Sequence, residues 1–144
     1  MRNVISVVLL AFVMTFVTSC KEEKKEAPIV INEQLKLVMD IHDEVMPKMS
    51  KLGRLVGKLK GIEDSTEIGL QYKEARVALQ DANKAMMDWM KQFGGKFKYD
   101  EIHKGKALTE QKLIWLDEEE VKVKALRDQI NSSIARAEQL LGKK

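Results

Sequence analysis

The feature that most constrains the fold is an apolar repeat with alternating three- and four-residue steps, which recurs in three segments after residue 32. A period of 3.5 residues sustained over several heptads places apolar side chains along one face of a helix, and it does not fit the two-residue alternation of a strand. In the first segment the repeat consists of Leu35, Val38, His42, Val45, Met49, Leu52, Val56 and Leu59. In the second it consists of Ile68, Tyr72, Ala75, Leu79, Ala82, Met86, Trp89 and Phe93. In the third it consists of Leu113, Leu116, Val123, Ile130, Ile134, Ala137 and Leu141, with Glu120 and Arg127 interrupting the row.

Three such helices bury their apolar faces most economically as an antiparallel three-helix bundle. The sequence therefore predicts an all-α, coiled-coil-like domain over residues 32–142, with helices at about 33–60, 66–93 and 110–141. A chain of 144 residues is long enough for one domain of this kind and too short for two.

Residues typical of helix starts support these bounds. Asn32 and Thr109 can each accept a hydrogen bond from a free amide of the first turn, and the spacing from Asp64 to Glu67 is that of a capping box. Between the second and third helices we expect one short helical turn near Asp100–His103.

Proline and glycine predict where the helices bend or end. Pro47 lacks an amide hydrogen and predicts a kink in the first helix. Gly61 is expected to end that helix, and the pair Gly94-Gly95 to end the second. Gly53, Gly57 and Gly61 also recur every four residues, which indicates either a face for close helix approach or a frayed helix end. The sequence leaves both interpretations open.

The first 19 residues have the pattern of a signal peptide. Arg2 precedes an uncharged apolar run from Val4 to Val17, which is too short to span a bilayer as a helix. The run ends in Val17-Thr-Ser-Cys20, which resembles a bacterial lipobox, and Cys20 is the only cysteine of the chain. The resemblance implies cleavage before Cys20 and acylation of Cys20, and several acyl chains make a stable membrane anchor.

The residues after Cys20 are too polar to be buried. Residues 20–31 contain the run Lys21-Glu-Glu-Lys-Lys-Glu26 and are expected to form a solvated tether. A Lys-Glu-Glu start after the lipid-bearing cysteine resembles the export signal of Bacteroidota surface lipoproteins. It implies an outer-membrane location, with exposure at the cell surface favoured over the periplasmic face.

Composition argues against several classes of function. The chain has 25 basic and 22 acidic residues, so no strong positive field indicates nucleic-acid binding. One cysteine cannot form an internal disulfide or a multi-thiolate metal site. Because no Ser/His/Asp set or phosphate-binding glycine loop is present, we expect no enzymatic activity.

One group of residues has the chemistry of a soft-metal site. If the first two helices turn near residue 64, His42 lies level with Met86 and Met39 level with Met90, with Met46 one turn away on the same face as His42. Imidazole and thioether groups suit Cu(I) or, in a helical bundle, haem iron. The alternative is ordinary core packing, because methionine is an adaptable core residue that packs well on aromatic rings such as those of Trp89 and Trp115. In that case Asp43, Glu119 or Glu120 would hydrogen-bond the His42 imidazole.

Two strings carry a family resemblance, Ile41-His-Asp-Glu-Val-Met-Pro-Lys-Met49 and Met86-Met-Asp-Trp-Met90. They are similar to a group of small uncharacterised Bacteroidota lipoproteins, some of which carry the label "viral A-type inclusion protein". The resemblance extends over nearly the whole chain and implies an all-α lipoprotein, but it implies no activity.

Together these observations predict a lipid-anchored, non-enzymatic helical bundle that acts as an interaction or structural module at the cell envelope. Its expected partners are the membrane, through Cys20, and either another envelope protein or a second copy of the chain. The alternative is a copper- or haem-binding module that uses His42 with Met39, Met46, Met86 or Met90; otherwise we expect no cofactor.

Overall fold

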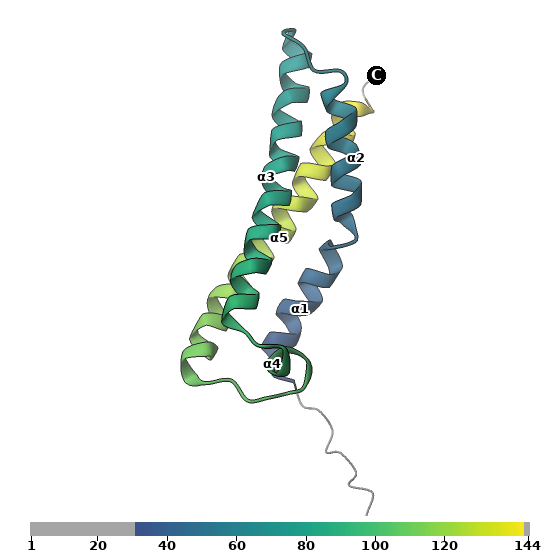
Figure 1. The fold of residues 1–144 in the computed structure, drawn as a ribbon. Coiled ribbons are helices and arrows are strands. Elements are labelled where there is room, and N and C mark those ends of the chain that lie inside the picture. The colour runs from purple at the N-terminus through teal and green to yellow at the C-terminus, as the bar shows by residue number, and fades with distance from the viewer. Residues whose placement is uncertain (1–30, 143–144) are drawn as a thin grey trace, which may run out of the picture.

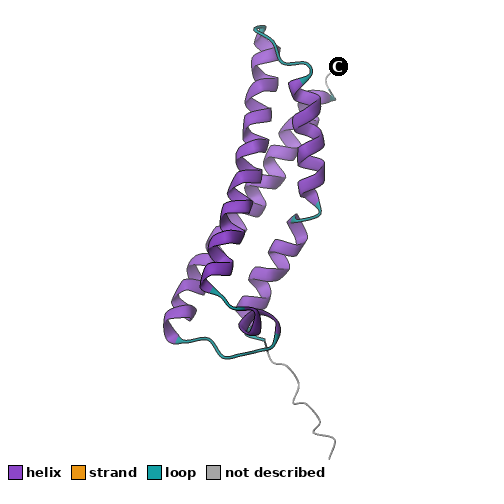
Figure 2. Ribbon diagram, in the orientation of Figure 1, coloured by secondary structure: helices purple, strands orange, loops and turns teal. Residues whose placement is uncertain are grey.

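The computed structural model describes residues 31–142, which form five helices. They are α1 (Glu33–Val45), α2 (Lys48–Lys60), α3 (Glu67–Lys96), α4 (Tyr99–His103) and α5 (Glu110–Leu141). In Figure 1, α3 runs antiparallel to α1, α2 and α5, and the short α4 closes the end of the bundle at which α1 begins. All regular structure in this range is helical (Figure 2). The predicted all-α bundle is therefore confirmed.

The predicted N-terminal features lie outside the described residues. These are the signal peptide at 1–19, the lipidation site Cys20 and the tether up to residue 30.

The first of the three long bundle elements consists of two helices instead of one kinked helix. α1 ends at Val45 and α2 begins at Lys48, so the predicted helix at 33–60 is broken at Met46-Pro47. The amide of Met46 still donates to the carbonyl of His42, but Pro47 has no amide hydrogen with which to continue the ladder. Pro47 therefore disrupts the helix as predicted, but it breaks the helix into two instead of kinking it.

Most helix starts lie where the sequence places them, with one correction. The side chains of Asn32 and Thr109 accept hydrogen bonds from the amides of Leu35 and Lys112, as N-caps do. At α3, however, Thr66 is the N-cap and not Asp64. The Asp64 carboxylate instead accepts from the backbone amide and the hydroxyl of Thr66.

The predicted end of α3 at Gly94-Gly95 is wrong. The helix continues through both glycines to Lys96, and the amide of Phe97 donates to the carbonyl of Phe93. Phe97 is only 1% exposed and its ring lies 4.7 Å from that of Phe93. A glycine costs about 1 kcal/mol in a helix, whereas burying a phenylalanine stabilises by about 1.5–3 kcal/mol, so burial of Phe97 carries the helix onward.

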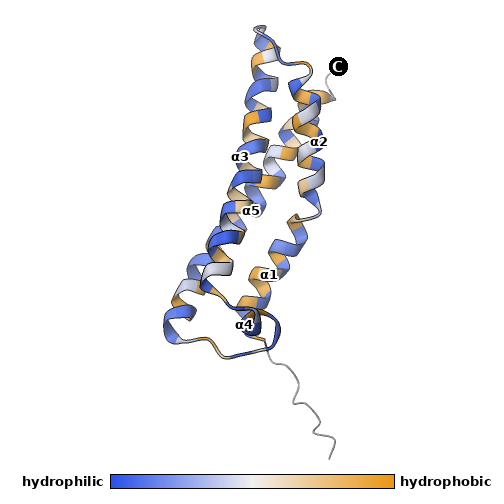
Figure 3. Cartoon of the chain, viewed as in Figure 1, coloured by the Kyte–Doolittle hydropathy of each residue, from blue (hydrophilic) through white to orange (hydrophobic). Residues whose placement is uncertain are grey.

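The core follows the predicted heptads, although the helices are rotated at several positions. Hydrophobic and hydrophilic residues alternate along each long helix (Figure 3). The buried side chains that the predicted rows left out are Ile41, Leu55, Phe97, Glu101, Glu119, Leu126, Ser133 and Leu140. Two members of the predicted rows, Ile68 and Leu113, are about two-fifths exposed. His42, Met49, Val56 and Leu141 are partly buried at the edge of the core.

The glycine row of α2 is neither a packing face nor a frayed end. α2 stays helical to Lys60 and is capped at Gly61. Gly53 and Gly57 are exposed, and a Cβ built on either one would meet no atom within 4 Å. These two glycines therefore make no close contact with a neighbouring helix, although Gly53 lines a hollow that Gln80 and Asn83 of α3 border.

Candidate functional site

A hollow of about 130 Å³ lies between α1, α3 and α4, and we call it the His42 hollow. It is lined by Met39 and His42 from α1, by Trp89, Met90, Phe93 and Gly94 from α3, and by Ile102 and His103 from α4. Three of the five predicted soft-metal ligands, Met39, His42 and Met90, thus meet at one place. A second histidine, His103, joins them from the connection between the two longest helices.

The His42 side chain is held by a hydrogen bond at Nδ1 and by contact with an aromatic ring. Its exposed fraction is 14%, and its Nδ1 lies 2.8 Å from a carboxylate oxygen of Asp43. The imidazole centroid lies 5.8 Å from the ring of Trp89, which in turn stacks on Phe93 at 4.9 Å. Of the hydrogen-bond partners considered from sequence, Asp43 is the one observed. His42 packs on Trp89, one helical turn from the predicted neighbour Met86.

The other two predicted ligands do not line the His42 hollow. Met86 is 0% exposed in the core. Met46 packs against the edge of the core and lies beside the break at Pro47. For these two residues the core-packing interpretation describes what is observed.

A buried ion pair fixes α4, which carries His103. Glu101 is 5% exposed; its carboxylate accepts from Lys112 Nζ at 2.6 and 2.8 Å and from the amide of Lys98 at 2.7 Å. Burial raises the pKa of Glu101, but the hydrogen bonds from Lys112 and Lys98 outweigh burial and leave that pKa below its ordinary value. The charged pair ties the short helix to the start of α5 and so places His103 over the hollow.

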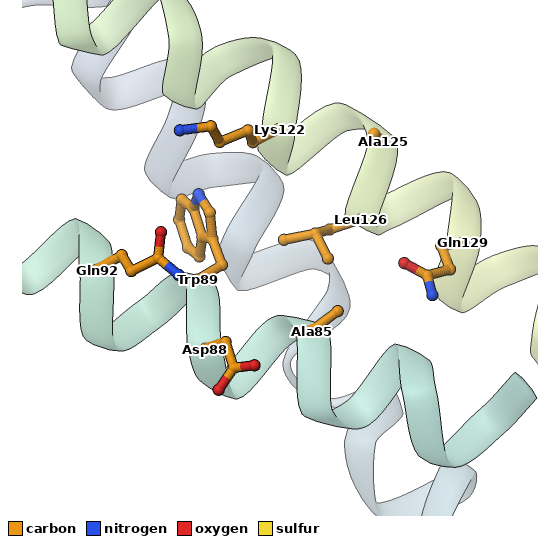
Figure 4. Close-up of a pocket in the computed structure, with 8 residues that line it drawn as sticks. All are labelled: Ala85, Asp88, Trp89, Gln92, Lys122, Ala125, Leu126 and Gln129. Atoms are coloured by element: carbon orange, nitrogen blue, oxygen red, sulfur yellow. The ribbon is translucent and has the colours of Figure 1, made fainter. Parts of the chain in front are cut away.

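Trp89 also forms the floor of a furrow between α3 and α5. This furrow, of about 280 Å³, is lined by Ala85, Asp88, Trp89, Gln92, Lys122, Ala125, Leu126 and Gln129. Figure 4 shows the indole directed toward α5, where Lys122 and Leu126 approach it. Its Nε1 is buried without a hydrogen-bond partner in the described part of the chain. Such an atom is rare because a buried unpaired donor costs about 1–3 kcal/mol.

Glu119 is a second buried polar group near this furrow. It is 1% exposed, and its Oε1 accepts from Lys96 at 2.8 Å and from Lys122 at 2.9 Å, whereas Oε2 has no partner among the described residues. Burial raises the pKa of Glu119, but the hydrogen bonds from Lys96 and Lys122 outweigh burial, and the pKa lies below its ordinary value. Lys96 also lies 5.7 Å from the ring centroid of Trp115.

Sequence reasoning did not place His103 at the site, and it considered Glu119 only as a hydrogen-bond partner of His42 and not as a core residue. His103 comes from a short connection whose position depends on the packing of α4, so no periodicity identifies it. Glu119 could have been found, because Leu126 fits the apolar row between Val123 and Ile130 better than Arg127 does. Extending that row back by one heptad from Leu126 gives Glu119 and not Glu120.

Comparison of the chain with known protein families, curated proteins and solved structures finds no match. Between residues 31 and 142 no cluster of three or more His, Cys, Asp or Glu side chains is arranged to hold a metal ion. None of the helices in the same range combines the length and the apolar composition needed to cross a bilayer.

Proposed function

We propose that this protein is a lipid-anchored, non-enzymatic helical bundle that serves as an interaction or structural module at the cell envelope. The lipobox ending in Cys20 and the charged run after it support the anchor. The Lys-Glu-Glu start after Cys20, which resembles the export signal of Bacteroidota surface lipoproteins, favours an outer-membrane location with exposure at the cell surface.

The observation that carries the proposal is the place where the bundle begins. α1 starts beside α4 at one end of the molecule (Figure 1), and eleven residues separate Cys20 from Asn32. An extended chain of that length spans at most about 40 Å, so acyl chains on Cys20 would hold this end near the membrane. α3 has 30 residues and is therefore about 45 Å long, which would place the far end well away from the lipid.

Exposed apolar side chains support a protein partner. Leu70 and Val77 on α3 are 50% and 41% exposed, and Ile114 and Val121 on α5 are 57% and 69% exposed. Each pair is spaced by seven residues along the outer face of its helix, as in a helix that meets another helix. We propose that the partner is another envelope protein or a second copy of this chain.

Metabolic labelling with an alkyne-bearing fatty acid tests the anchor in a Bacteroidota host that expresses the full chain. The wild-type protein is expected to carry the label and to sediment with membranes, whereas Cys20→Ser is expected to lose both properties. Ser19→Ala is the matched control, because it keeps a small residue in the lipobox and is expected to retain the label. An unlabelled wild-type protein, or a labelled Cys20→Ser protein, would contradict the proposal.

Two further measurements test on which face of the outer membrane the protein lies and what its oligomeric state is. Protease added to intact cells is expected to digest the protein, whereas digestion only after the outer membrane is opened would place it on the periplasmic face. Sedimentation of the detergent-solubilised protein distinguishes the partners, because a dimer identifies a second copy and a monomer requires another envelope protein.

A further inference from the structure

The His42 hollow gathers four side chains that can each donate electrons to a soft metal ion. Met39 and Met90 supply thioether sulfurs, and His42 and His103 supply imidazole nitrogens. They come from three helices, α1, α3 and α4, so the periodicity of one helix does not account for their meeting. Thioether and imidazole groups together suit Cu(I), whereas hard ions such as Mg²⁺ require oxygen ligands.

His42 has the arrangement typical of a metal-binding histidine. Its Nδ1 is engaged by the Asp43 carboxylate at 2.8 Å, which leaves Nε2 as the nitrogen available to a ligand. Metal-binding histidines nearly always donate their other ring N–H to a carboxylate, a carbonyl or a water, which fixes the tautomer and raises the basicity of the free nitrogen. Contact with Trp89 restrains the same ring from the side.

The surroundings of the hollow suit a small cation. None of the eight residues that line it is a lysine or an arginine. The rings of Trp89 and Phe93 border the hollow, and aromatic faces attract cations that lie over them. The volume of about 130 Å³ accommodates a metal ion with its ligands, but it is well below the 300–1,000 Å³ of sites that hold drug-sized ligands. A porphyrin is larger still, so the structure favours copper over haem.

We propose that the His42 hollow binds one Cu(I) ion through Nε2 of His42, the sulfurs of Met39 and Met90, and the imidazole of His103. Asp43 is a positioning residue that orients His42, and the Glu101–Lys112 pair holds α4 so that His103 can reach the ion. This site does not depend on the lipid anchor, so either proposal can fail without the other.

The test uses residues 21–144, because every fully buried side chain of the described bundle comes from residues 35–140. This fragment lacks Cys20, so methionine provides its only sulfur ligands. Cu(I) is titrated into it in the presence of a coloured Cu(I) chelator and a reductant that does not bind copper. We expect one ion per chain, bound tightly enough to remove copper from the chelator.

Variants then assign the ligands, with circular dichroism verifying that each variant is folded. Met39→Leu and Met90→Leu keep apolar bulk, and each is expected to weaken Cu(I) binding at least tenfold, as are His42→Ala and His103→Ala. Asp43→Asn is expected to weaken binding 10- to 100-fold without removing a ligand. Met87→Leu is the matched control, since Met87 is 52% exposed and does not line the hollow; its affinity is expected to equal that of the wild type.

Trp89 gives a second, independent readout. In a Trp115→Phe background it is the only tryptophan, so Cu(I) bound beside it is expected to quench the fluorescence in proportion to occupancy. Absence of binding by the folded wild-type fragment would overturn the proposal. Equal loss of affinity in Met87→Leu and Met90→Leu would do so as well, because it would show that the chain binds copper through thioethers in general.

Discussion

The buried carboxylate of Glu119 allows a prediction in which two substitutions at one ion pair have opposite effects. Glu119 occupies a heptad position between Leu116 and Val123 that is otherwise apolar in α5, and it is 1% exposed. Removing the lysine partner leaves the buried carboxylate without full compensation of its charge. Replacing the carboxylate itself by a hydrocarbon side chain leaves no buried charge. We therefore expect Lys96→Met to destabilise the bundle and Glu119→Leu to be neutral or stabilising.

The expected loss in the free energy of unfolding for Lys96→Met follows from the contacts that the substitution removes. The substitution removes the 2.8 Å hydrogen bond to Glu119, and a hydrogen bond to a charged group contributes about 1.5–3 kcal/mol. It also removes the cation–π contact with Trp115, which contributes about 0.5–1 kcal/mol. Lys122 still binds the carboxylate, so we expect a loss of about 2–3 kcal/mol, less than the 3–5 kcal/mol of a fully broken buried pair.

Glu119→Leu removes the buried charge and leaves two lysines that reach solvent. The side chains of Lys96 and Lys122 are 25% and 46% exposed, so both ammonium groups can be hydrated after a small movement. The leucine would extend the apolar row of α5. Replacing buried ion pairs by well-packed hydrophobic residues is often neutral or stabilises by about 1–4 kcal/mol, and we expect a change between zero and about 2 kcal/mol of added stability.

Urea unfolding monitored by circular dichroism at pH 7 and pH 4 provides the assay. The folded-state pKa of Glu119 lies below its ordinary value of 4.5, so the stability that the pair contributes is fully present above about pH 4.5. It is lost as the pH falls through the folded-state pKa. The difference between wild type and Lys96→Met should therefore shrink on acidification. A Lys96→Met protein within 0.5 kcal/mol of wild type at pH 7, or a Glu119→Leu protein as unstable as Lys96→Met, would refute the reasoning.

Three other substitutions test local features of the fold by thermal and urea unfolding. Gly53→Ala should stabilise the bundle by about 0.5–1 kcal/mol, because its Cβ meets open space and alanine is the better helix former; a loss of stability would show a contact that the structure lacks. Gly69→Ala should destabilise by about 1–3 kcal/mol, because its Cβ would lie 2.7 Å from the backbone nitrogen and oxygen of Asp64; an unchanged midpoint would contradict that close approach. Lys112→Met should cost about 2–3 kcal/mol by leaving Glu101 buried with only a backbone partner, and hydrogen exchange should then increase at the amides of α4 first.

Much of the fold could be predicted because it depends on local spacing. The bounds of α5 agree with the prediction, since the Thr109 cap and a 3.5-residue period, interrupted only at Glu120 and Arg127, are local signals. A disruption of the helix at Pro47 was also predicted, because a missing amide hydrogen interrupts the hydrogen-bond ladder of any helix. Seven of the eight residues predicted for the apolar row of the second helix are buried in α3, and Ile68 is the exception.

The candidate site was only partly predictable. Met39, His42 and Met90 could be placed at one level because the predicted first and second helices form a hairpin that turns near residue 64. His103 could not, since its position depends on how α4 folds back over the end of the bundle and on the pairing of Glu101 with Lys112. Met46 and Met86 share the chemistry of the other predicted ligands but do not line the His42 hollow, which composition and spacing cannot show.

The sequence by itself determined that the chain forms long amphipathic helices, where they begin, and which broad face of each is buried. Only the tertiary structure decided that α3 continues past Gly94-Gly95, that Lys96 and Lys122 pair with the buried Glu119, and that two histidines border one hollow. The physical reason is the range of the interactions. Capping and periodicity act within a turn or a heptad, whereas the burial of Phe97 and the pairing of Glu119 with Lys96 depend on partners that only the folded chain brings together.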